Sequence, residues 1–342
     1  KMATELIKFE RVDTNFYDKL GISYYVHGGC KFNCEYCFLV GYHRSNKWKN
    51  RSAPRGFKHQ PTIDQHIDVM DVIFKLQTPY FIYLYGGEPT EYKHIHELIE
   101  YIYRHKTSWL SHIEMQTNLN TTVDDLKLFC GYDNIEISPT LHLDHLKGDT
   151  IYDLVDKIDT IYDSGKLARV DFIMAKNSER QVRELHDIFK NKPYFDKILY
   201  TRTFLEINSG PGALNHHEHG KDVYTGRFNT GDQFTDICDE TIYKETYKLT
   251  YSDDTSEVAD INRLYDRHMN FKGWVCDAGK KLMLVDYTGD WWICDNEYIK
   301  NPPAGNLVQD PRSFIQNTKF PHVCKLDKCD GCFYINRVKP KK

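Results

Sequence analysis

Short apolar runs alternate with helical patterns from residue 20 to about 207. Six runs rich in β-branched and aromatic residues have the length of strands, at 21–26, 80–86, 112–118, 134–141, 168–175 and 197–207. The stretches between them repeat apolar residues three and four positions apart and predict helices, among them 62–77, 91–106, 121–131 and 178–191. Because a helix carries the chain back to the edge where the last strand began, this order predicts parallel strands in an α/β barrel or open sheet.

The rest of the chain follows a different pattern. Residues 208–270 begin with a polar stretch rich in Gly, His and Asn, and then alternate apolar and polar positions around a pair of aspartates, which is typical of a hairpin. A second alternating pattern, with a turn that ends at Gly289, predicts a hairpin over 282–293. We therefore expect three parts: a first domain over 1–207, an insert or linker over 208–270, and a small α+β domain over 271–342.

Composition fits one large core with a smaller one beside it. The chain has 342 residues, of which 40% are hydrophobic. Lys+Arg number 45 and Asp+Glu 49, and no basic block dominates, so we expect no nucleic-acid footprint. The sequence has no run of eighteen apolar residues, which predicts no membrane span. Ten cysteines, some at C-x2-C spacing, favour metal binding in a reducing compartment and hence a cytoplasmic protein.

Three cysteines near the start of the chain form the first candidate site. Cys30, Cys34 and Cys37 have the spacing C-x3-C-x2-C. Three thiolates at this spacing would leave one iron of a [4Fe–4S] cluster open to a substrate or cofactor. The alternative is a zinc site, in which His27 or His43 would supply the fourth ligand.

A glycine-rich turn after the second predicted strand is another candidate. An aromatic run ends in Gly86-Gly87-Glu88-Pro89. Two glycines at a strand end allow the backbone to approach a ligand closely, because neither carries a Cβ. Glu88 offers a carboxylate to a cationic group. Alone, the motif would also fit an ordinary strand-to-helix turn.

Together the two motifs resemble those of the radical S-adenosylmethionine (SAM) enzymes. In that family an aromatic residue, here Tyr36, precedes the third cysteine, and the Gly-Gly-Glu-Pro turn holds the methionine amino group of SAM. The resemblance implies a partial (β/α)6 barrel and a [4Fe–4S] cluster that binds SAM. It also implies reductive cleavage of SAM to a 5′-deoxyadenosyl radical, which abstracts hydrogen from a substrate, and a flavodoxin- or ferredoxin-type electron donor.

The resemblance suggests further contacts at strand ends. Asn118 would hydrogen-bond the methionyl or ribose part of SAM, and Ser138 would contact the ribose. Arg169 and Arg202 come from later strands, where an ordinary polar role is the favoured interpretation. The polar cluster at 141–145 would either contact the substrate or cap the next helix.

Five cysteines after residue 270 form a further pattern. The hairpin over 282–293 has a cysteine before its first strand and one after its second, which brings both thiols to the same end. With the closing C-x2-C pair, the pattern resembles the twitch part of the SPASM domain of radical SAM enzymes. There, four thiolates ligate one auxiliary [4Fe–4S] cluster, and the matching residues here are Cys276, Cys294, Cys329 and Cys332. Cys324 is either a replacement ligand or a buried cysteine. A full SPASM domain would need seven cysteines, and a zinc ribbon is the structural alternative.

The sequence gives less direct information about the substrate class than about the cofactors. A single auxiliary cluster favours a small molecule, such as a sugar, amino acid, nucleoside or nucleotide. The 29 residues before Cys30 are too few for the leader-binding domain of many peptide-modifying relatives. A peptide maturase that installs a crosslink, thioether or epimerised residue is the alternative, and a non-catalytic metal-binding scaffold would require the two motifs to coincide by chance. Cys238, in the insert, would return a hydrogen atom to a substrate radical if it faces the active site.

Overall fold

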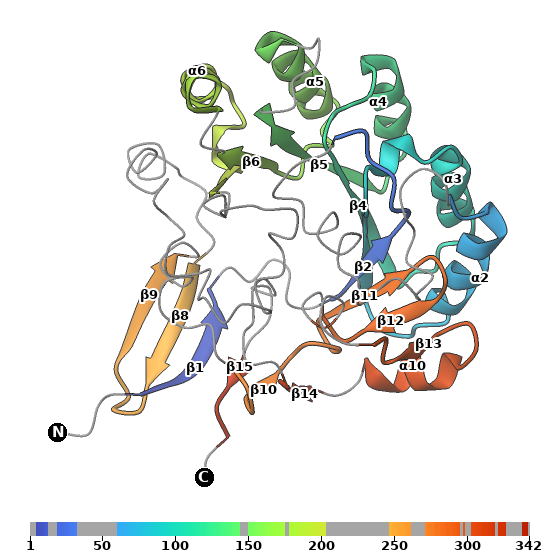
Figure 1. Cartoon of the computed structure of the whole chain (residues 1–342), viewed down its shortest axis with the longest axis vertical. Helices are drawn as coiled ribbons and strands as arrows, with labels where there is room; N and C mark the ends of the chain where they lie inside the picture. The colour runs from blue at the N-terminus through green and yellow to red at the C-terminus, as the bar shows by residue number, and fades with distance from the viewer. Residues whose placement is uncertain are drawn as a thin grey trace, which may run out of the picture.

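The computed structural model describes residues 5–12, 19–32, 60–143, 150–174, 178–202, 246–260, 271–294, 297, 302–318, 321–325 and 337–340. Within these residues the chain forms a large, mostly parallel sheet and a smaller antiparallel sheet. Helices follow the outside of the large sheet (Figure 1).

The large sheet contains nine described strands, in the order β13-β12-β11-β2-β3-β4-β5-β6-β7. Neighbours from β11 to β7 run parallel, whereas β12 and β13 run antiparallel to their neighbours. The strands are β2 (Leu20–Tyr25), β3 (Tyr80–Tyr85), β4 (Leu110–Thr117), β5 (Ile135–His142), β6 (Val170–Met174), β7 (Ile198–Arg202), β11 (Leu282–Asp286), β12 (Asp290–Trp292) and β13 (Gly305–Asn306).

Successive parallel strands from β2 to β7 are joined through helices, and short 3-10 turns η3 (Pro89–Glu91) and η6 (Phe195–Lys197) lie among them. The helices are α2 (Ile63–Ile73), α3 (Ile95–His105), α4 (Val123–Cys130), α5 (Ile151–Asp163) and α6 (Glu179–Phe189). A further helix, α10 (Pro311–Asn317), follows β13. Thr62, Thr122 and Thr150 begin α2, α4 and α5, and each side chain accepts a hydrogen bond from a backbone N–H of the first turn. Such a cap contributes about 1 kcal/mol and fixes the residue at which the helix begins.

The main hydrophobic core lies between the large sheet and its helices. Helix α3 illustrates how the sequence produces it, because Ile95, Leu98, Ile99 and Ile102 are buried at the spacing of one helix face. Burial of each such side chain contributes about 1.5–3 kcal/mol. This face packs into the core formed by the sheet and the neighbouring helices.

The smaller sheet has the order β14-β10-β15-β1-β8-β9, and all its described neighbours are antiparallel. Its strands are β1 (Leu6–Arg11), β8 (Thr246–Tyr251), β9 (Ser256–Asp260), β10 (Val275–Cys276), β14 (His322–Val323) and β15 (Arg337–Val338). It has a hydrophobic cluster of its own, centred on Phe9, Tyr247 and Phe271. The sheet therefore joins segments from both ends of the sequence.

The α/β class and the mostly parallel sheet are confirmed, because β2 to β7 coincide with the six predicted strands. Both predicted hairpins form, as β8–β9 and β11–β12. Strand β1 and helix α5 were not predicted. Strand β11 pairs in parallel with β2, so the large sheet extends into the part of the chain that we assigned to a small C-terminal domain. The three-part division stays a prediction.

No helix within the described ranges is long and apolar enough to cross a membrane.

Candidate cofactor site

The glycine-rich turn after β3 lies against the loop that begins the cysteine motif. The N–H of Gly87 donates to the carbonyl of His27 at 2.8 Å, and the N–H of Glu88 donates to the carbonyl of Gly29 at 2.7 Å. A Cβ on Gly87 would lie 1.9 Å from the Gly29 oxygen, and one on Gly86, whose φ is +146°, would lie 2.5 Å from the His27 oxygen. The glycines therefore allow the two loops to approach, a role that the sequence did not suggest.

His27 is fully buried and both of its ring nitrogens are engaged. Nε2 lies 2.7 Å from the carbonyl oxygen of Glu88, which can only accept, so Nε2 carries the proton and donates. Nδ1 then accepts from the N–H of Gly29 at 3.2 Å. Burial lowers the pKa of His27, which favours this neutral form. His27 is therefore not available as the fourth ligand of a zinc site. His43 lies outside the described residues.

The carboxylate of Glu88 joins the end of β3 to the end of β4. Its Oε1 accepts from the N–H and hydroxyl of Thr90 and from the hydroxyl of Thr117, at 3.1, 2.6 and 2.8 Å. Its Oε2 accepts from the N–H of Asn118 at 2.6 Å. The residue is 1% exposed, and burial raises the pKa of its carboxyl against the lowering effect of these hydrogen bonds. Among the described residues, no lysine or arginine is paired with it.

Asn118 connects this carboxylate to the first cysteine. The residue directly follows β4 and is 8% exposed. Its side-chain amide donates to Sγ of Cys30 at 3.5 Å, while its backbone N–H is bonded to Glu88. Cys30, Glu88 and Asn118, predicted from separate motifs, therefore meet at the carboxyl ends of β2, β3 and β4, which is where α/β folds place their chemistry.

A second group of polar side chains lies deeper, on the face of the parallel strands away from the helices. Tyr24 of β2 bonds to His66 of α2 and pairs with Leu84 of β3, so Leu84 faces the helices and its neighbour Tyr83 faces away. Glu114 of β4 is the register partner of Tyr83. We call this side of the strands the inner face.

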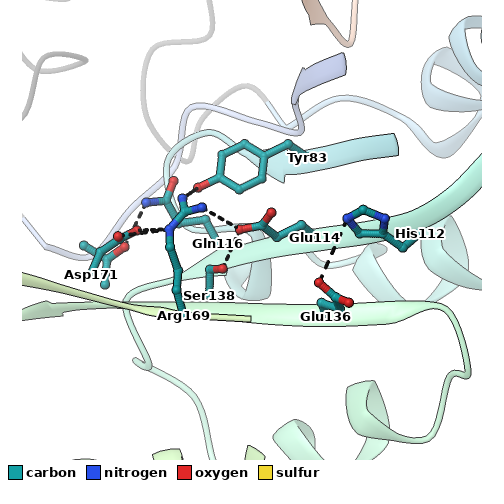
Figure 2. Close-up of polar contacts among 9 residues, drawn as sticks. Tyr83, His112, Glu114, Gln116, Glu136, Ser138, Arg169 and Asp171 are labelled. Carbon is teal, nitrogen blue, oxygen red and sulfur yellow. Dashed lines mark hydrogen bonds and ion pairs between the residues drawn. The ribbon is translucent and has the colours of Figure 1, made fainter. Parts of the chain in front are cut away.

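Arg169 is the centre of this group (Figure 2). Its Nε donates to both oxygens of Asp171, at 3.0 and 3.2 Å, and its Nη2 donates to the hydroxyl of Tyr83 at 3.1 Å. Its Nη1 lies 3.2 Å from Oε1 of Glu114, which also accepts from the hydroxyl of Ser138 at 2.5 Å. We call these five residues the inner-face cluster. Burial raises the pKa of Asp171, and the adjacent guanidinium opposes that rise.

Ser138 thus differs from the expectation for it. Strand β5 continues to His142, so Ser138 lies within the strand rather than at its end, and its hydroxyl is bonded to Glu114. Its contact with a SAM ribose stays a prediction. His142 does lie at the end of β5, where its ring contacts Phe32, next to the cysteine loop, with centroids 6.0 Å apart.

Gln116 and His112 lie two positions after and two positions before Glu114 on β4, and they also lie on the inner face. Gln116 donates from its side-chain amide to the hydroxyl of Thr140 at 2.8 Å. The ring of His112 stacks on Phe81. It also lies 4.0 Å from the carboxylate of Glu136 (Figure 2). The sequence contained a sign of this polar face that we did not use. A strand covered on both faces is expected to be apolar throughout, yet β4 has polar residues at every second position.

At the C-terminal cysteines, Cys276 and Cys294 are buried in one small cluster with Leu282. The direct approach of their two thiols stays a prediction. Leu282 pairs with Gly21 near the amino end of β2, at the opposite end of the sheet from Cys30. Cys324 packs instead against the hydrophobic cluster of the smaller sheet.

Several predicted site residues lie outside the described residues. They are Cys34, Tyr36, Cys37, Asp144, His145, Cys238, Cys329 and Cys332. Arg202 is the last residue of β7, and its side chain lies outside the described part of the structure.

The family model that matches the sequence is that of the Radical SAM superfamily, over residues 24–192. No curated protein gives a significant match. Among solved structures, native anSMEcpe with bound AdoMet has a TM-score of 0.53 and 15% identity over 88% of this chain and 83% of the other. A structure of anSMEcpe with bound AdoMet and the Kp18Cys peptide has a TM-score of 0.53 and 13% identity over 88% and 81%.

SuiB of Streptococcus suis, bound to the precursor peptide SuiA, has a TM-score of 0.51 and 16% identity over 88% of this chain. This chain spans only 64% of the SuiB chain. At such identities the likeness is one of fold.

Proposed function

We propose that the protein is a radical SAM enzyme, as the family model over residues 24–192 indicates, and that Cys30, Cys34 and Cys37 hold a [4Fe–4S] cluster at which SAM is reductively cleaved. When bound, the cluster and SAM supply a 5′-deoxyadenosyl radical that removes a hydrogen atom from the substrate. The observation that carries this proposal is the pairing of the Gly-Gly-Glu-Pro turn with the cysteine loop through Gly87 and Glu88. Backbone hydrogen bonds thus join two motifs that are about 50 residues apart in the sequence, directly beside Cys30.

The residues that are present suit a cationic cofactor. Glu88 is a buried carboxylate that neutral donors surround, and a buried anion is stabilised strongly by an opposite charge. We assign the methionine amino group of SAM to Glu88 and to the backbone around Gly86, Gly87 and Pro89. Asn118 donates to Cys30 and so orients the first thiolate from the neighbouring strand. Thr117 and Thr90 fix the Glu88 carboxylate.

We also propose one auxiliary [4Fe–4S] cluster with Cys276, Cys294, Cys329 and Cys332 as ligands. The shared burial of the first two supports it. Cys324 is partly buried against the other cluster of apolar side chains, which supports a packing role rather than a role as replacement ligand. A flavodoxin- or ferredoxin-type protein would supply the electron for SAM cleavage.

For the substrate we propose a small polar molecule. The inner face of the strands carries hydrogen-bonding side chains of both charges, which suits recognition of a compact polar compound. Two solved structures of similar fold contain bound peptides, SuiA in SuiB and Kp18Cys in anSMEcpe. A peptide substrate is therefore the second candidate.

The test is release of 5′-deoxyadenosine by the anaerobically reconstituted and reduced protein. Cell extract, separated by size into small-molecule and peptide fractions, serves as the source of substrate. Release that the small-molecule fraction stimulates supports the proposal, whereas stimulation by the peptide fraction alone supports the second candidate. A Cys34→Ala variant that still releases 5′-deoxyadenosine would show that the cluster assignment is wrong.

A further inference from the structure

The inner-face cluster combines two buried carboxylates with one guanidinium. The side chains of Glu114, Asp171 and Arg169 are 3%, 9% and 12% exposed. With both acids ionised, the group carries one more negative charge than positive. Among the described residues that flank the cluster on β4 and β5, Glu136 and His112 do not offset this charge. Glu136 is another acid, and burial lowers the pKa of His112, which favours its neutral form.

Among the described residues, Glu114 has polar partners at only one of its two carboxylate oxygens. Its Oε1 contacts both Arg169 and Ser138, while its Oε2 accepts no hydrogen bond from any described residue. An ionised carboxylate has room for about four hydrogen bonds, and a buried one that lacks partners is costly. Glu114 is 2% exposed, and its Oε2 therefore keeps room for a further donor, such as an N–H group of a ligand.

A purely structural brace would explain these features less well. Buried ion pairs stabilise a fold only when charges and hydrogen bonds are balanced. Apolar residues of similar volume often give a fold at least the same stability. Here the charges are unequal, and both Tyr83 of the cluster and the neighbouring Gln116 are only partly buried. An inner face that is charged and incompletely covered is typical of a ligand site rather than a core.

The cluster also lies in line with the cofactor site. Glu114, Gln116 and Asn118 follow one another at every second position, so the inner face of β4 leads from the cluster to the residue that touches Cys30. At a rise of about 3.3 Å per residue, Glu114 lies roughly 13 Å below Asn118. A compound of a few rings or residues would span this distance, with one end at the cluster and a C–H bond near SAM.

From these observations we infer that the inner-face cluster holds an amino or guanidino cation of the substrate, with Glu114 Oε2 as the acceptor of its N–H groups. The inference rests on the proposed function and names the chemistry of the substrate for that same site. Both a small amine and a peptide with a Lys or Arg side chain have this chemistry, and the size of the active compound distinguishes them.

The experiment separates the small-molecule and peptide fractions of the extract further, on cation- and anion-exchange resins at neutral pH. Each pool is added to the reduced wild-type protein with SAM, and 5′-deoxyadenosine is measured. We expect the stimulating compound in the pool that the cation exchanger retains. A compound found in the unretained or anion-exchange pool overturns the inference while the proposed function stands. No release of 5′-deoxyadenosine with any pool rejects both.

Variants then test the cluster itself with the active pool. Glu114→Gln and Asp171→Asn each remove one negative charge, and we expect either to raise the amount of pool needed for half-maximal release by about tenfold or more. The matched control is Glu97→Gln on helix α3, whose side chain is 58% exposed and lies away from the inner face, and it is expected to behave as wild type. Iron content and circular dichroism confirm that each variant is folded. Unchanged half-maximal amounts in folded Glu114→Gln would overturn the inference.

Discussion

The side-chain amide of Asn118 donates a hydrogen bond to Sγ of Cys30 at 3.5 Å. The contact joins residues that are 88 positions apart and links the end of β4 to the loop after β2. The same asparagine is bonded through its backbone to Glu88. One residue thus connects the proposed iron ligand with the proposed partner of the SAM amine.

Asn118→Ala is expected to lower the reduction potential of the cluster and to slow 5′-deoxyadenosine release. Hydrogen bonds to the ligating sulfurs stabilise the reduced, more negative cluster, so their loss disfavours reduction. A redox titration followed by electron paramagnetic resonance measures the potential. Asn120→Ala is the control, because Asn120 lies on the same loop and donates to Glu91 rather than to a cysteine. Equal potentials in Asn118→Ala and wild type would contradict the assignment.

Gly87→Ala is expected to abolish cluster retention and to destabilise the protein by more than about 3 kcal/mol. The new Cβ would lie 1.9 Å from the Gly29 oxygen, and a backbone atom cannot rotate away as a side chain can. Gly165→Ala provides the comparison, because Gly165 has a φ of +72° but a Cβ added there would meet no described atom within 4 Å. Its expected cost is about 1–2 kcal/mol, from backbone strain alone. Iron content and urea unfolding distinguish the two variants, and full iron content in Gly87→Ala would show that the loops can separate without loss of the site.

The sequence predicted those site residues that belong to short motifs directly after a strand. Cys30 and Glu88 follow strands that the apolar pattern located, and parallel strands bring their carboxyl ends together. Arg169 and Glu114 could not be paired in this way, because the contact depends on the register between β4, β5 and β6. A shift of one residue would turn either side chain to the helix side.

The pairing of β11 with β2 was missed for a related reason. An apolar strand with an adjacent hairpin partner satisfies the pattern of an independent small domain equally well. The sequence pattern does not indicate that the other edge of β11 pairs with a strand from near the start of the chain.

Glu88→Gln and Thr117→Val together test whether the charge of Glu88, rather than its position alone, holds SAM. Thr117→Val removes one hydrogen bond to Oε1 and one from the N–H of Leu119, at a cost of about 1–3 kcal/mol. Glu88→Gln removes the charge and is expected to destabilise the protein by a similar amount, because an amide NH2 would face donors. We expect SAM affinity to fall at least tenfold in Glu88→Gln and much less in Thr117→Val. Equal affinities, measured by equilibrium dialysis, would reject the charge assignment.

The raised pKa of Asp286 leads us to expect that the free energy of unfolding depends on pH. Asp286 ends β11 as a buried carboxylate, and burial raises its pKa from 3.8 to about 7, against the opposing effect of hydrogen bonds from Thr288 and Asp290. The folded protein therefore binds a proton here that the unfolded chain has released, between about pH 4 and pH 7. The contribution of Asp286 to the free energy of unfolding is fully present below pH 4 and falls by about 1.4 kcal/mol for each pH unit through that window.

Asp286→Asn is therefore expected to be more stable than wild type at pH 8, by a few kcal/mol, and about equally stable at pH 4. The hydrogen bonds from Thr288 and Asp290 all reach Oδ1, which the asparagine retains, so only the charge is lost. Asp286→Ala removes the acceptor as well, and should be less stable than Asp286→Asn at both pH values. Anaerobic urea unfolding at the two pH values measures each difference. An Asp286→Asn variant less stable than wild type at pH 8 would mean that the carboxylate is ionised and favourably bonded in the fold.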